Sequence, residues 1–313
     1  MLNYKQKILK PLESGWKFFK AIIDKWTDDK APKLVAAVSF YTIFSLSPIL
    51  LITIAVVGFI FGKEAARGEI VEQIGGLVGT EGAKIVQTAI QNAGENSSGI
   101  IAAIISVIVL IAASTGVFIE LQDSLNIIWK IKPKPSRGFF RSLIMDRLIS
   151  FAMVLGMGFV MLVSLIISAL LSALNKFIGS YFSIPIDLLE LLNILVSFII
   201  IFLLFSMIFK FLPDIIIQWR DVWAGALVTS ILFVLGKYLI GIYLGSSSYT
   251  STYGAAGSLV IFLMWVYYSA QILFLGAEFT YIYAVKYGSG YKPKNEFFEQ
   301  ISGTGYNNKE EAE

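Results

Sequence analysis

Residues 187–209 read DLLELLNILVSFIIIFLLFSMIF, a stretch in which no charged residue follows Glu190 before Lys210. As a helix rising about 1.5 Å per residue, it covers the roughly 30 Å hydrocarbon core of a bilayer. Five further stretches are similarly long and apolar: 34–62, 99–118, 147–172, 221–244 and 257–285. The sequence therefore predicts an all-α polytopic membrane protein, a six-transmembrane-helix bundle with amphipathic surface helices.

Lys and Arg are distributed unevenly over the segments that connect these stretches. Nineteen of them fall in one alternate set: 1–33, 119–142, 210–220 and 286–313. Only four fall in the other set: 63–98, 173–186 and 245–256. Because basic residues favour the cytoplasmic side of a membrane, we expect both termini in the cytoplasm.

Composition agrees with a membrane protein and narrows the chemistry. Hydrophobic residues make up 56% of the 313 residues, and the mean hydropathy is +0.74. The chain has no Cys, so disulfides and thiolate ligands are excluded, and no His, the commonest general base and metal ligand. We therefore expect no catalytic residue, no metal site, no cofactor and no enzymatic activity.

The chain divides into three parts. Residues 1–33 form a basic amphipathic segment that lies in the headgroup layer or docks against the bundle. Its apolar residues recur at helical spacing, and its lysines lie on another side: Trp16, Phe19, Ile23 and Trp26, then Lys17 and Lys20. Residues 34–286 form the membrane domain, whose outer loop 63–98 reads as two short amphipathic helices. Residues 287–313, rich in Gly, Asn, Lys and Glu, are expected to be disordered.

Several motifs occur in a fixed order over roughly residues 30–285. The first motif is Ala36-Ala37-Val38-Ser39-Phe40-Tyr41 with Ser45 and Pro48, and the second is Leu121-x-Asp123-Ser124-Leu125-Asn126-x-Ile128-Trp129. The third is Leu212-Pro213-Asp214, followed by Trp219-Arg220-Asp221 and Gly225-Ala226. The fourth is Tyr249 with Tyr253-Gly254 and Gly257, followed by Gly276-Ala277-Glu278. With them the chain resembles the YihY/virulence factor BrkB family, once labelled ribonuclease BN. The resemblance implies a six-span protein of the bacterial inner (plasma) membrane, with a role in envelope or lipid-related transport.

Two charges fall inside the expected spans, where ionisable groups are costly and by default mark functional positions. Lys237, in the fifth span, could pair with Asp187 or Glu190, snorkel to the outer headgroups, or contact a substrate. Glu278, in the inner half of the sixth span, could be neutralised by Arg147 or Lys210. Together, Lys237 and Glu278 fit either a polar path through the bundle or two separate structural pairs.

Other candidate positions are polar but uncharged, or lie at the membrane boundary. Tyr249, Tyr253 and Gly254 belong to a hydroxyl-rich segment that could bind sugar or phosphate oxygens, fold back into the bundle, or form a plain external turn. Tyr41 could line a cavity or mediate helix packing. Asp221 is expected to cap the fifth span, while Arg220 anchors the interface beside Trp219.

An RNA-cleaving enzyme is not expected. The short basic loops lack paired carboxylates that could hold two metal ions, and they lack aromatic residues on which the bases of single-stranded RNA could stack. Two classes of function remain. The first is a transporter or flippase for an anionic lipid or amphiphile in envelope biogenesis. The second is a non-catalytic membrane scaffold or assembly partner. The expected partners are anionic membrane lipids, and a second copy or an envelope protein, but no nucleic acid.

Overall fold

The computed structural model describes residues 2–61, 115–133, 186–245, 257–294 and 298–301, together with Gly68, Gln87, Ala152 and Gly156. Its long helices are α1 (Leu2–Asp28), α2 (Ala31–Phe61), α5 (Gly116–Ile128), α7 (Ile186–Phe211), α8 (Trp219–Gly245) and α10 (Gly257–Lys286). Four short strands join them: β1 (Ile131–Pro133), β2 (Ile215–Ile217), β3 (Tyr291–Pro293) and β4 (Phe298–Gln300).

Three helices in the described part of the chain are long and apolar enough to cross a membrane. Their qualifying stretches are Ile194–Phe211, Trp219–Ile240 and Phe262–Lys286. α2, α7, α8 and α10 begin and end within a few residues of the expected spans, and α1 confirms the expected N-terminal helix. The expected spans 99–118 and 147–172 and the loop 63–98 lie mostly outside the described residues, so the count of six stays a prediction.

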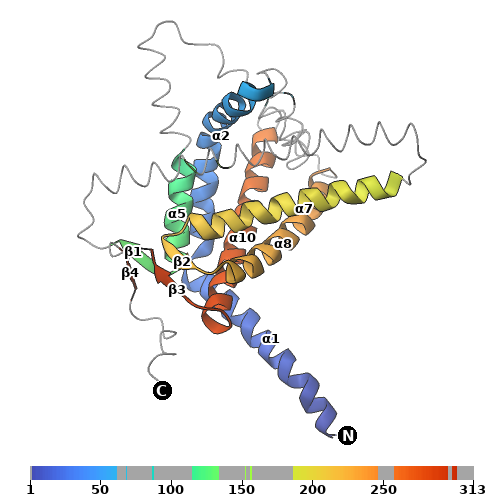
Figure 1. The fold of residues 1–313 in the computed structure, drawn as a ribbon, viewed down its shortest axis with the longest axis vertical. Coiled ribbons are helices and arrows are strands. Elements are labelled where there is room, and N and C mark those ends of the chain that lie inside the picture. Colours follow the sequence, from blue (N-terminus) through green and yellow to red (C-terminus); the bar gives the residue numbers. More distant parts are fainter. Residues whose placement is uncertain are drawn as a thin grey trace, which may run out of the picture.

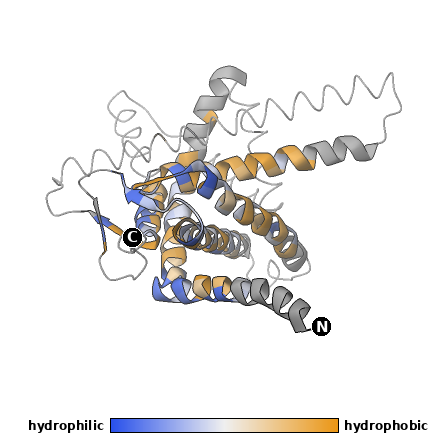
Figure 2. Cartoon of the chain, turned by 60° about the horizontal axis from the view of Figure 1, so that its bottom comes forward, coloured by the Kyte–Doolittle hydropathy of each residue, from blue (hydrophilic) through white to orange (hydrophobic). Residues whose placement is uncertain are grey.

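α10 is the central helix, because it contacts α8, α2, α1 and α5, while α7 packs on α8 (Figure 1). Apolar colour runs along the described part of α7, and hydrophilic colour gathers around the strands and neighbouring helix ends (Figure 2). α10 contacts most of the other described helices. The charged groups that it buries are therefore the first candidates for a site.

α8 and α10 approach each other through a reciprocal pair of Gly and Thr residues. A Cβ atom at Gly225 would lie 1.8 Å from Thr280 Oγ1, and one at Gly276 would lie 1.9 Å from Thr229 Oγ1. Each Thr hydroxyl donates to the carbonyl of the Gly one turn earlier on its own helix, at 2.7 Å for Thr229 and 2.6 Å for Thr280. Small residues of this kind allow close helix approach in membranes. The two motif glycines are therefore packing positions.

The strands join segments that are far apart in sequence at one end of the helices. β1, which follows α5, pairs antiparallel with β4, with Ile131 opposite Gln300. β2, between α7 and α8, pairs antiparallel with β3, with Ile215 opposite Pro293. These are three of the four segments that the charge distribution assigns to one side, and the end of α1 joins them through contacts described below. The structure thus places the basic segments together.

The expectation of a disordered tail is wrong for residues 288–294 and 298–301. Ser289 binds the start of α8, and β3 and β4 each find a partner strand. The composition of the tail predicted disorder because it reflects only local residue content, such as Gly and Lys. The backbone groups of β3 and β4 form hydrogen bonds with strands that are distant in sequence, and residue content does not reveal those partners.

Candidate functional site

Four alternating charges form a buried chain where α1 meets α10 and the end of α5. Lys25 Nζ lies 2.5 Å from Asp29 Oδ2 and 2.7 Å from Glu278 Oε2, and it donates to the Ile128 carbonyl at 2.7 Å. Lys130 forms an ion pair with the other oxygen of Asp29. Asp29 is 1% exposed and Glu278 is 0% exposed. We call Lys130, Asp29, Lys25 and Glu278 the ion chain.

Among the described residues, the partner of Glu278 is one that the sequence analysis did not suggest. Its cation is Lys25 of the N-terminal helix, whereas Lys210 donates to the Ile217 carbonyl and lies over the ring of Trp219. Arg147 lies outside the described residues. The contact with Lys25 is an ion pair by distance. Glu278 is thus held by a cation that α1 supplies.

Aromatic rings enclose the ion chain on the side of the strands. Lys25 Nζ lies 4.2 Å from the ring centroid of Tyr281, which is the arrangement of a cation–π contact. Trp129 packs edge-on against Tyr281 and Tyr291, at 5.6 and 5.1 Å between centroids. Burial raises the pKa of Tyr291, which lies in β3, so its hydroxyl stays protonated. This enclosure excludes water and strengthens the electrostatic attraction inside the chain.

A second buried polar cluster joins two of the sequence motifs. Asp214 Oδ2 accepts hydrogen bonds from Gln122 Nε2 at 3.0 Å and Asn126 Nδ2 at 2.9 Å. The backbone N–H of Asp214 donates to Asn126 Oδ1 at 2.8 Å. The segment after α7 is thereby held to α5 by both the side chain and the backbone of one residue. The motif's Asp has a structural role that sequence reasoning did not assign to it.

Asp221 has a different role from the expected cap. It lies in the first turn of α8, where a negative charge is favourable for the helix dipole. Its Oδ2 accepts hydrogen bonds from the backbone N–H of Ser289 at 3.0 Å and from Ser289 Oγ at 2.6 Å. It therefore holds the segment that follows α10 rather than an N–H group of its own helix. Arg220 is exposed beside the exposed Trp219, as an interfacial anchor would be.

The remaining predicted positions are not brought together into one site. Lys237 is half-buried on α8 and has no ion pair or hydrogen bond among the described residues. It follows Phe233 by one turn, and Phe233 packs on Phe205, so Lys237 lies on the side of α8 that faces α7. The side chains of Asp187 and Glu190, and the whole of Tyr249, Tyr253 and Gly254, lie outside the described part. Tyr41 lies against Gly116 of α5, 42% exposed.

α1 presents three distinct faces, and the structure shows that it docks on the bundle; its position in the headgroup layer stays a prediction. One face docks on the bundle through Ile22, Lys25 and Phe18, whose ring meets Phe279 edge-on at 5.4 Å, and Asp29 follows directly after the helix. A second face is apolar and exposed: Trp16 67%, Phe19 52% and Ile23 42%. The third face carries charges: Lys17, Lys20, Asp24 and Asp28. The signal that could have revealed the ion chain is Lys25, which helical periodicity places on the docking stripe.

These features define a helical membrane protein in which a basic amphipathic helix is fixed to a membrane-spanning helix by buried charges. Residues 22–299 match the family described as Virulence factor BrkB, and the chain belongs to that family. The match includes Lys25, Asp29 and most of β4, so it extends beyond the motifs at both ends.

Its relatives are described as membrane proteins. A UPF0761 membrane protein of Ralstonia nicotianae is 27% identical over 252 residues, which are 80% of this chain and 55% of that protein. A UPF0761 membrane protein of Psychrobacter sp. is 26% identical over 281 residues, 88% of this chain and 51% of that protein. The chain therefore spans about half the length of these curated relatives. No solved structure matches it.

Proposed function

We propose that the protein transports or flips an anionic lipid or amphiphile at the bacterial inner membrane, in support of envelope biogenesis, and that it is not an enzyme. The observation that carries this proposal is the docking of α1. Its inward face is fixed to α10 by the ion chain, its apolar face is exposed, and Lys17 and Lys20 are exposed beside that face. Such a helix lies in the headgroup layer and attracts anionic lipids.

The transport proposal is tested with purified protein in vesicles that contain labelled phosphatidylglycerol or labelled phosphatidylcholine. Protein should speed the crossing of the anionic label over empty vesicles, and Lys17→Gln with Lys20→Gln should slow it several-fold. The matched control is Asp24→Asn with Asp28→Asn, which removes the opposite charge from the same face and should not slow crossing. Equal rates with folded protein and with empty vesicles would reject transport of these lipids.

A scaffold is the second candidate, and the pairing of Glu278 within the ion chain favours it. Among the described residues of the membrane-spanning helices, Glu278 is taken up in the ion chain, and Lys237 lacks an ionic partner. Lys237→Met therefore separates the two functions. In a transporter it should slow crossing of the anionic label while the folded fraction is unchanged. If the protein is a scaffold, cells that carry Lys237→Met should grow like cells that carry the unchanged protein.

The cytoplasmic position of both termini belongs to the same proposal. The chain has no native Cys, so single cysteines report position without interference. A cysteine at Lys5 or Gly303 should be protected from an impermeant thiol reagent in intact cells, and one at Ser247 should react. The opposite labelling pattern would reverse the orientation and place the basic segments outside.

A further inference from the structure

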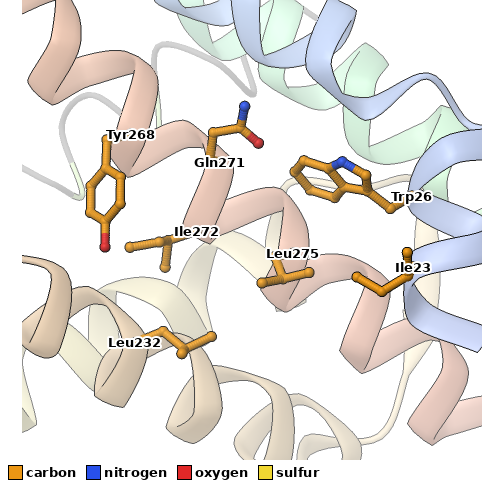
Figure 3. A pocket seen from close by; sticks show the side chains of 7 residues that line it. All are labelled: Ile23, Trp26, Leu232, Tyr268, Gln271, Ile272 and Leu275. Carbon is orange, nitrogen blue, oxygen red and sulfur yellow. The ribbon is translucent and has the colours of Figure 1, made fainter. Parts of the chain in front are cut away.

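A cavity of about 380 Å³ lies between α1, α8 and α10. α1 contributes Ile23 and Trp26, α8 contributes Leu232, and α10 contributes Ile272 and Leu275 to its apolar walls (Figure 3). Tyr268 and Gln271 of α10 complete the lining. None of these described lining residues is charged, so the cavity suits an uncharged part of a ligand.

The size of the cavity sets the amount of hydrocarbon that it can hold. An apolar cavity of about 150 Å³ holds benzene, with six carbon atoms. By that ratio this cavity holds about fifteen carbon atoms, close to the length of one acyl chain. Because α8 and α10 are long and apolar enough to span a membrane, bilayer lipid is the natural source of such a chain.

The polar groups of the lining point to a ligand that is more than a hydrocarbon. Gln271 lies in the middle of α10, and within the described residues its amide has no hydrogen-bond partner. The hydroxyl of Tyr268 instead lies against Gly236 of α8, where a Cβ atom would be 1.9 Å away, and it points away from the amide of Gln271 (Figure 3). An amide at membrane depth is unfavourable unless a partner satisfies it. A neutral acceptor such as an ester carbonyl would do so.

We propose that this cavity binds a single ester-linked acyl chain of a membrane lipid, with the ester carbonyl at Gln271. The chain packs on Leu232, Ile272 and Leu275, and Ile23 and Trp26 of α1 close it from the side. The inference rests on the proposed function only for the lipid nature of its ligand, and its test measures binding and not transport.

The test uses quenching of Trp26 fluorescence in nanodiscs of phosphatidylcholine and phosphatidylglycerol. The probe is lysophosphatidylcholine with a dibrominated stearoyl chain, since bromine quenches nearby indoles. Total fluorescence should show a saturable loss at low probe content. That saturable part should disappear in Trp26→Phe and persist in Trp16→Phe, because Trp16 lies on the exposed face of the same helix. Loss that rises only in proportion to the probe would reject a site.

Two further variants test the position and chemistry of the site. Leu232→Phe should raise the half-saturating probe content about tenfold or more by filling the cavity, whereas Leu235→Phe, on the exposed side of α8, should not change it. Gln271→Leu should weaken binding of the ester probe about two- to tenfold, the range for one hydrogen bond, and leave the ether analogue unaffected. Thermal unfolding of each variant confirms that it is folded.

Each outcome decides the proposal. Equal effects of Leu232→Phe and Leu235→Phe in folded protein would show that the probe binds elsewhere. Equal losses of the ester and ether probes with Gln271→Leu would overturn the ester contact. Binding without lipid crossing would retain this site and reject the transport proposal, and crossing without saturable binding would do the reverse.

Discussion

The ion chain predicts an asymmetry between its two central members. Replacement of Lys25 by Met leaves the carboxylate of Glu278, which is 0% exposed, without a cation from the described residues, whereas Asp29 keeps Lys130. Replacement of Glu278 by Gln leaves Lys25 with Asp29 at 2.5 Å and with the Ile128 carbonyl at 2.7 Å. The first change therefore strands a buried charge, and the second does not.

The magnitudes follow from what each variant leaves behind. Stranding a buried charge by removing its partner costs about 3–5 kcal/mol, so Lys25→Met should reduce the free energy of unfolding by that amount. Glu278→Gln loses one ion pair but strands no charge, so we expect about 1–3 kcal/mol, the cost of a lost buried polar contact. Adding Glu278→Gln to Lys25→Met removes the stranded charge, so the double variant should be more stable than Lys25→Met alone.

Four proteins are compared: the unchanged protein, Lys25→Met, Glu278→Gln and the double variant. The free energy of unfolding of each is measured in mixed micelles by titration with a denaturing detergent. The control is Lys210→Met, since Lys210 donates to the Ile217 carbonyl and its described ring contact is with Trp219. Lys210→Met should show no coupling with Glu278→Gln. If the Lys25 and Glu278 effects add within about 0.5 kcal/mol, or if Glu278→Gln is the more damaging change, the ion chain does not hold α1 as described.

Further predictions concern packing, backbone strain and the polar cluster. Gly225→Ala should destabilise the protein by about 1–3 kcal/mol, because the new Cβ would overlap the Thr that it faces on α10. The control Gly15→Ala has nothing within 4 Å and should be neutral or slightly stabilising through its helix propensity. Equal shifts of the melting temperature in the two variants would contradict the close crossing. Lys30→Gly should stabilise the protein by up to about 1 kcal/mol, because glycine adopts the φ of 53° at this position without strain. Lys130→Gly, at the same φ, also loses the ion pair with Asp29 and should destabilise the protein. If chemical unfolding shows that both variants change stability in the same direction, this reasoning is wrong. Asn126→Leu should cost about 1–3 kcal/mol by leaving polar groups of the segment after α7 unsatisfied, and an unchanged melting temperature would count against the cluster.

Much of the helical architecture could be predicted from the sequence, because an apolar run of membrane length carries its own signal. The bounds of α7, α8 and α10 agree with the expected spans for this reason, and the heptad-like spacing of Trp16, Phe19 and Ile23 marks an exposed face of α1. The partner of Glu278 could not be predicted in the same way. Depth alone left Arg147 and Lys210 as candidates, while Lys25, the partner of Glu278 among the described residues, lies on a helix outside the expected membrane domain.

The polar contacts at the strand end were missed for a related physical reason. Asp214 and Asp221 each look like a local turn or cap residue, because Asp commonly serves those roles. In the structure their hydrogen bonds go to α5 and to the segment after α10. Local sequence rules cannot distinguish a short-range acceptor from a long-range one, since the same carboxylate chemistry serves both.

The pairing of β1 with β4 and of β2 with β3 has a consequence for biosynthesis. The segments that follow α5 and α7 emerge from the ribosome and wait, unpaired, until residues 291–300 are translated. The helices can enter the membrane one after another, yet the end of the molecule that holds the basic segments closes only after α10 has been inserted. A released chain that ends shortly before Tyr291 would therefore contain all the described helices but lack β3 and β4, and quality-control proteases could recognise the unpaired edges of β1 and β2.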